Sequence, residues 1–172
     1  SSHRILSTAT HSGDGVFGKA TGTKLVYRVI ADCHAKNNQI NDEWLIRDLG
    51  AIVQKLGWTA KDYSRQQIAD EGGPNSCIRP FSPVSDIAGP YQGSGNDDEW
   101  GQVYADSLNA IMSGDLSVVN TRYDRAVMGA YPCNETAIGR SDITTFWTAL
   151  RASFPSARLL ILKFFSNILW SI

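Results

Sequence analysis

The chain has 172 residues, of which 42% are hydrophobic and 19% charged, and its formal net charge is −1. This length supports one good hydrophobic core or two incomplete ones. Near neutrality excludes a surface that attracts polyanions, so we expect no nucleic-acid partner. Cys33, Cys77 and Cys133 are far apart and outside any metal-ligand spacing, which predicts free thiols in a reducing, cytoplasmic setting and no metal site.

Both ends of the chain are unusual. It begins at Ser1 without an initiator Met or a signal peptide, which suggests a cut or processed boundary. The last residues, 159–172 (LLILKFFSNILWSI), are almost all apolar but too short to span a bilayer, and Lys163, Ser166 and Asn167 interrupt them. We expect a buried strand followed by a stub rather than a membrane anchor, and hence no membrane partner.

The first third of the chain is typical of an antiparallel hairpin that leads into a helix. Gly-rich and Asn-rich turns separate runs of β-branched and aromatic residues, and Gly57 follows a stretch with helical spacing. In chain order the predicted elements are a strand over 4–10, a long turn over 11–22, strands over 24–34 and 40–46 joined at Asn37-Asn38, and a helix from Leu49 to Leu56.

The rest of the chain is richer in predicted helices. Residues 72–95 form a Gly/Pro/Ser-rich connector without periodicity, and a loop of this length is expected to separate two structural units. After it, capping residues and apolar spacing predict further elements. These are a helix from Asn96 to Met112, a short helix over 115–123, a short strand over 126–131, a helix from Ser141 to Phe154 and a strand over 157–165.

Asp48, at the end of the predicted hairpin, is the main candidate for chemistry. A strict register from the Asn37-Asn38 turn places it on an apolar side, directly across the ladder from Tyr27. Loss of hydration there would raise its pKa towards that of a general base, with Tyr27 as a helper donor. The alternative is that Asp48 caps the helix that begins at Leu49.

The same strict register divides the other hairpin residues between two sides. The apolar side carries Val29, Ala31, Trp44 and Ile46, and the other side places Arg28 opposite Arg47 and Asp32 opposite Glu43. His34, near the hairpin tip, lies on the charged side, and a one-residue bulge would move it to the apolar side. His34 is therefore a candidate catalytic residue, with a surface or structural role as the alternative.

Two blocks of the sequence resemble a known family. Residues 10–57, with THSG.G.FG.ATG, a hairpin and then EW...D...I...LG, resemble the closing strands of SnoaL-like polyketide cyclases, within the superfamily resembling nuclear transport factor two. Residues 104–127 (YADSLNAIMSGDLSVVNTRYDRAV) resemble the first helices and first strand of that fold, and 139–157 (GRSDITTFWTALRASFPSA) resemble its pocket-covering helix and next strand.

The resemblance implies a fold, an activity and a site. The fold is α+β, with a strongly curved antiparallel sheet, helices on its concave face and a deep apolar pocket. The activity is ring closure by intramolecular aldol chemistry with neither metal nor organic cofactor, Asp48 acting as acid/base and His34 as the nearest match to an assisting histidine. The expected pocket lining, which suits a small apolar or aromatic ligand, is Tyr27, Val29, Trp44, Ile46, Trp100, Tyr104, Tyr123, Phe146 and Trp147.

The order of the blocks departs from the family, which runs helices first and hairpin last. The chain is therefore expected to hold the closing strands of one unit (1–57), a helix plus the Gly/Pro-rich connector (58–95), and the opening helices and strands of a next unit (96–172). The alternative is a circular permutation in which both halves pair within the chain.

Two functions remain open from the sequence. One is a cofactor-independent acid–base catalyst of the cyclase or isomerase type, and the other is a non-catalytic ligand-binding or assembly module on the same scaffold. A homodimer is expected, because a half-built sheet leaves edges and apolar faces to cover. A raised pKa of Asp48 would favour catalysis, and hydrogen bonds from backbone amides to its carboxylate would favour the second function.

Overall fold

The computed structural model describes residues 2–79 and 99–159, which divide into two compact units. Of the described residues, unit 1 holds 2–79 together with 132–134, and unit 2 holds 99–131 and 135–159. The predicted strand over 157–165 and most of the apolar C-terminal stretch lie outside the described residues, as does the predicted helix start at Asn96. The α+β class is confirmed.

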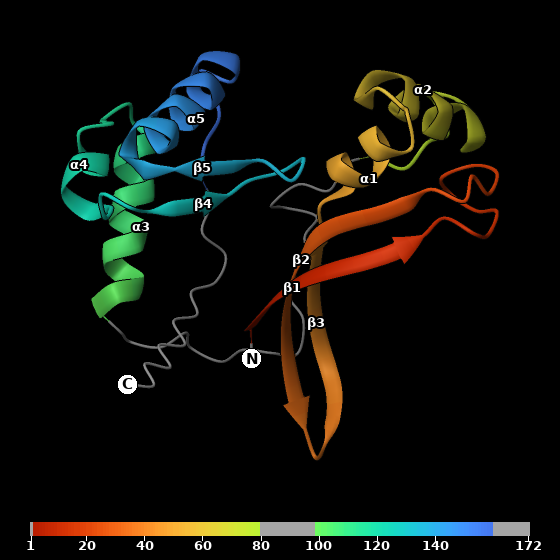
Figure 1. Ribbon diagram of the computed structural model, residues 1–172, viewed down its shortest axis with the longest axis horizontal. Coiled ribbons are helices and arrows are strands. Elements are labelled where there is room, and N and C mark those ends of the chain that lie inside the picture. Colours follow the sequence, from red (N-terminus) through yellow and green to blue (C-terminus); the bar gives the residue numbers. More distant parts are fainter. Residues whose placement is uncertain (1, 80–98, 160–172) are drawn as a thin grey trace. The chain divides into compact units, whose positions relative to one another are not determined.

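Unit 1 is a three-stranded antiparallel sheet followed by two helices (Figure 1). The strands lie in the order β1-β2-β3, and α1 contacts β2. The predicted strands and the first helix are confirmed, with longer strands than expected. The bounds are β1 Ser2–Thr10, β2 Lys24–Lys36, β3 Gln39–Arg47, α1 Leu49–Lys55 and α2 Ala60–Asp70.

The turn between β2 and β3 is the two-residue turn that its sequence predicts. Asn37 and Asn38 have φ values of 53° and 59°, in the left-handed region that asparagine tolerates. Lys36 therefore pairs with Gln39, which agrees with the predicted start of the register.

The strict register does not continue along the hairpin. Ala35 pairs with Ile40 but His34 pairs with Asp42, so that Asn41 is an extra residue on β3. This bulge moves every later residue of β3 by one position relative to β2. The predicted pairs of Arg28 with Arg47 and of Asp32 with Glu43 are therefore wrong: Asp32 pairs with Trp44 instead.

The two faces of the sheet differ in burial. Leu25, Val29 and Ala31 of β2 are buried, and they alternate with exposed or half-buried residues, as expected for a strand with one covered face. The buried residues of α1, Ala51, Ile52 and Val53, complete the core of unit 1.

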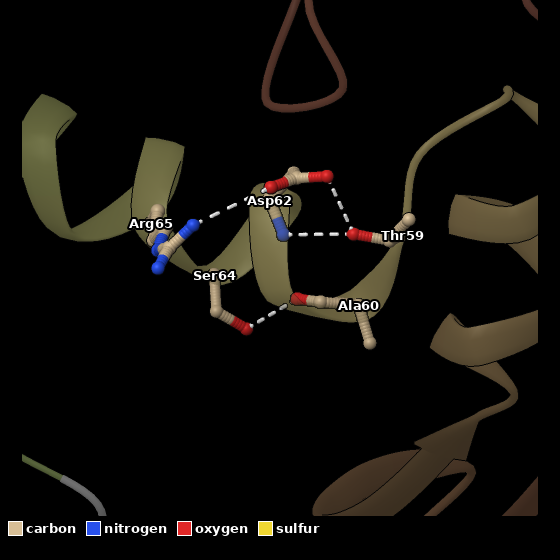
Figure 2. Close-up of polar contacts among 5 residues, drawn as sticks. All are labelled: Thr59, Ala60, Asp62, Ser64 and Arg65. Atoms are coloured by element: carbon tan, nitrogen blue, oxygen red, sulfur yellow. Dashed lines mark hydrogen bonds and ion pairs between the residues drawn. The ribbon is translucent and has the colours of Figure 1, made fainter.

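The start of α2 shows how local sequence sets a helix boundary (Figure 2). The Thr59 hydroxyl accepts a hydrogen bond from the Asp62 amide at 3.1 Å, which makes Thr59 the N-cap. The same hydroxyl donates to the Asp62 carboxylate at 2.7 Å, and Arg65 lies 3.8 Å from that carboxylate. These contacts give the Asp62 amide an acceptor within the same segment of the chain, so the helix start does not depend on a tertiary partner.

Unit 2 packs three helices with a two-stranded antiparallel sheet. Its core consists of Ile111, Val119, Ala137 and Ile143. The short strand β5 (Thr136–Ile138) was not predicted, whereas β4 (Met128–Ala130) lies within the strand predicted over 126–131. The bounds are α3 Glu99–Met112, α4 Val118–Arg122, β4 Met128–Ala130, β5 Thr136–Ile138 and α5 Gly139–Ser153.

Candidate functional site

The Asp48 carboxylate accepts three hydrogen bonds from backbone amides. Its Oδ1 accepts hydrogen bonds from the amides of Ala51 at 3.0 Å and Cys133 at 2.8 Å, and its Oδ2 accepts from the amide of Asn134 at 2.8 Å. The bond from Ala51 makes Asp48 the N-cap of α1, so the capping alternative is confirmed. The other two bonds fasten a distant turn of the chain to the same carboxylate.

The electrostatics of this site are the opposite of those expected for a general base. Partial burial by itself raises the pKa of Asp48, but the three amide donors and the Arg28 charge outweigh it and lower the pKa below its usual value. The predicted rise is therefore wrong. A carboxylate that is ionised at neutral pH and already holds three donors is a weak proton acceptor.

The Cys133-Asn134 turn directs two successive backbone amides towards the Asp48 carboxylate. Cys133 and Asn134 have φ values of 64° and 58°, and consecutive residues in such conformations can direct their amides towards one acceptor. Gly50 makes room for this contact, since a Cβ there would lie 2.7 Å from the Cys133 Sγ. The sequence did not reveal this partner, because it lies 85 and 86 residues from Asp48.

The strict register predicted Tyr27 as the hydrogen-bond donor to Asp48, and this prediction is wrong. The Asp48 amide donates to the Arg28 carbonyl at 2.9 Å, which continues the shifted register and leaves Tyr27 on the other face of the sheet. Backbone amides take the role that was expected of the phenol.

His34 lies on the same face as Trp44 but at the opposite end of the hairpin from Asp48. Its Nδ1 is 2.6 Å from the Asn41 Oδ1, at the bulge. Asp48 joins the ladder at Arg28, which lies six positions along β2 from His34, a distance of about 20 Å. One small substrate cannot contact both groups, so the two predicted catalytic residues do not form one site.

The predicted lining residues of unit 1 are divided between the two faces of the sheet. Val29 is buried on one face, with Tyr27 on the same side, whereas Trp44 and Ile46 pair with Asp32 and Ile30 on the other. The bulge causes this separation, because it inverts β3 relative to the strict register. These residues do not line one pocket.

Most of the predicted aromatic lining lies in unit 2. Phe146 and Trp147 have ring centroids 5.4 Å apart, and Phe146 stacks on Tyr131 at 3.6 Å, a partner that the sequence did not single out. Burial, with the nearby Tyr104 and Tyr131, raises the pKa of Tyr123 to about 12. Phe146 and Tyr131 also line a cavity of about 280 Å³. The side chain of Trp100 lies outside the described residues.

The second face of the sheet in unit 1 carries several exposed apolar side chains among charged ones. Four side chains from all three strands make up this surface, which we call the open face: Leu6 (68% exposed), Ile30 (54%), Trp44 (37%) and Ile46 (63%). Their pairing places them on one side, since Ile30 lies opposite Ile46 and Leu6 opposite Arg28. Apolar side chains gathered in this way mark an interaction surface more often than scattered ones.

A groove of about 450 Å³ lies in unit 1 beside the Asp48 contacts. It is lined by Lys24, Val26, Ala51, Gln54, Lys55, Cys133 and Asn134. Among the residues that the structure describes, no group of three or more His, Cys, Asp or Glu side chains is placed to hold a metal ion.

Searches for related proteins and for membrane segments add no further assignment. Comparisons with protein-family models, with curated proteins and with solved structures find no match. Across residues 2–79 and 99–159, no helix combines the length and apolar character needed to cross a bilayer.

Proposed function

We propose that the chain is an assembly module that pairs with a second copy of itself through the open face of unit 1. The observation that carries the proposal is the exposure of Leu6, Ile30, Trp44 and Ile46 on one side of a three-stranded sheet. An exposed apolar sheet face in water favours a protein partner. The satisfied Asp48 carboxylate also fits a structural rather than a catalytic role.

The charge pattern of the open face favours a second copy over an unrelated partner. Asp32 and Arg28 lie on this side of β2, each two residues from Ile30. A two-fold axis that passes near Ile30, in the plane of the interface and perpendicular to β2, would place Asp32 of each copy against Arg28 of the other. The face is thus complementary to itself in charge along β2.

The expected dimer is weak. Covering the exposed parts of the four apolar side chains on both copies contributes about 10 kcal/mol. Association costs about 4–15 kcal/mol in lost translational and rotational freedom. At the low end of this cost, the difference of about 6 kcal/mol predicts a dissociation constant of about 40 μM.

Sedimentation velocity and light scattering, at concentrations from low micromolar upwards, test the pairing. Wild type is expected to shift from monomer to dimer with concentration, and Ile30→Glu is expected to stay monomeric. Ile78→Glu is the matched control, because Ile78 is also exposed in unit 1 but lies outside the sheet. A monomer at every concentration, or equal effects of the two variants, would contradict the proposal.

A charge exchange tests the two-fold geometry. Asp32→Arg alone and Arg28→Asp alone each place like charges together and should weaken the dimer. Mixing the two variants restores both opposite-charge pairs in the heterodimer, so the mixture should associate more tightly than either variant alone. If mixing restores nothing, the proposed axis is wrong.

We also propose that unit 1 is the closing sheet of a SnoaL-like cone, in which Asp48 has become a structural anchor. The antiparallel order of β1, β2 and β3 and the acid at the start of α1 support this scaffold. Carboxyl-carbon NMR of Asp48 distinguishes anchor from acid/base. A pKa below the usual Asp value of about 3.9 supports the anchor, and a pKa well above it would restore polyketide-cyclase chemistry.

A further inference from the structure

Two of the residues that line the groove of unit 1 are lysines, and none of the described lining residues is an acid. Lys24 is the first residue of β2 and Lys55 the last residue of α1, and both line the groove. In the described part of the chain, neither lysine makes an ion pair. The groove therefore offers two cationic side chains to an anionic ligand.

The remaining lining is partly apolar and is held in place. Val26, which is 48% exposed, supplies apolar surface, and the Asn134 side-chain amide donates to the Val26 carbonyl at 2.7 Å. The Gln54 amide reaches the Cys133 Sγ at 3.5 Å. The volume of about 450 Å³ is in the range of small-molecule sites.

The Asp48 carboxylate is not part of the groove lining, although it accepts hydrogen bonds from three residues that are. Its two oxygens accept the amides of Ala51, Cys133 and Asn134. Its role is to hold the Cys133-Asn134 turn that forms one wall.

We infer that this groove binds a small organic anion, with a carboxylate or phosphate head between Lys24 and Lys55 and an apolar body on Val26. Two cationic side chains select the head by charge, and the apolar surface selects a ligand larger than an inorganic ion. The inference does not depend on self-association, because it uses none of the four open-face side chains.

Amide NMR titration with five probes tests the ligand class. Phenyl phosphate and benzoate should cause saturable shifts at Ala51, Gln54 and Asn134, at least tenfold tighter than benzyl alcohol or benzylammonium. Inorganic phosphate should bind more weakly than phenyl phosphate. Equal binding of the neutral or cationic probe, equal binding of inorganic phosphate, or shifts only outside the groove would overturn the inference.

Matched lysine variants test the two charges. Lys24→Gln and Lys55→Gln should each weaken phenyl phosphate binding by about threefold to tenfold, whereas Lys61→Gln, on exposed α2, should leave it unchanged. In a Cys33→Ser/Cys77→Ser background, phenyl phosphate should slow alkylation of Cys133. Equal effects of all three lysine variants, or an unchanged rate of alkylation at saturating probe, would contradict the proposed position of the ligand.

Discussion

Replacing Asp48 with alanine is the most direct perturbation of unit 1. The change removes one acceptor group that serves three amides, at Ala51, Cys133 and Asn134. Loss of a helix N-cap costs about 1 kcal/mol. Hydrogen bonds to a charged group contribute about 1.5–3 kcal/mol each, and we take about 1 kcal/mol for each of the other two because the site is only partly buried.

The expected cost of Asp48→Ala is therefore about 3 kcal/mol in the free energy of unfolding of unit 1. Urea denaturation measures the total, and amide hydrogen exchange locates it. Exchange at Cys133 and Asn134 should accelerate by about 100-fold, since these amides lose their acceptor.

Asp62→Ala is the matched control, because Asp62 is also an acid at the start of a helix, and its contacts are local (Figure 2). Its expected cost is about 0.5 kcal/mol. If Asp48→Ala costs no more than Asp62→Ala, the carboxylate does not anchor the distant turn.

Acid should abolish the difference between wild type and Asp48→Asn. The pKa of Asp48 is lowered in the folded state, so its contribution to stability is fully present above the unfolded pKa of about 3.9 and is lost as pH falls through the folded value. Denaturation curves of the two proteins should therefore differ at pH 7 and converge in strong acid. A gap that stays constant would show that ionisation of Asp48 is not what stabilises the contact.

Four further outcomes are expected. Thr59→Ala removes the N-cap of α2 and should cost about 1 kcal/mol in urea denaturation. Ile143→Ala should destabilise unit 2 by about 3 kcal/mol, because Ile143 is only 1% exposed in the core. Gly129→Ala would place a Cβ 2.7 Å from the Ile143 Cδ1, so its cost of about 2 kcal/mol should fall in the Ile143→Ala background, where double-mutant denaturation measures the coupling. The pKa of Tyr123 is about 12, so the phenolate absorbance that Tyr123→Phe removes should appear only in strongly alkaline solution.

The elements that the sequence predicted are those with strong local signals. The Asn37-Asn38 turn fixes a hairpin because both residues tolerate positive φ, and Asp48 begins α1 as a cap. Such features depend on a few adjacent residues. They are therefore readable without knowledge of the tertiary structure.

What the sequence failed to predict depends on contacts between distant residues or on single insertions. Two of the amides that bind Asp48 lie 85 and 86 residues away in the chain. A prediction from the residues around Asp48 therefore placed it among apolar side chains and did not include the amides that lower its pKa. The bulge at Asn41 leaves the composition of β3 unchanged while it inverts the strand. The predicted pocket side of the hairpin therefore did not form, although its residues were correctly assigned to strands.

The bulge at Asn41 also gives β3 one residue more than its pairing with β2 requires. Deleting Asn41 would close the bulge and leave Trp44 opposite Asp32 and Ile46 opposite Ile30, so the open face would keep its apolar side chains. A loss of three nucleotides at this codon would thus shorten the strand without changing the chemistry of either face of the sheet.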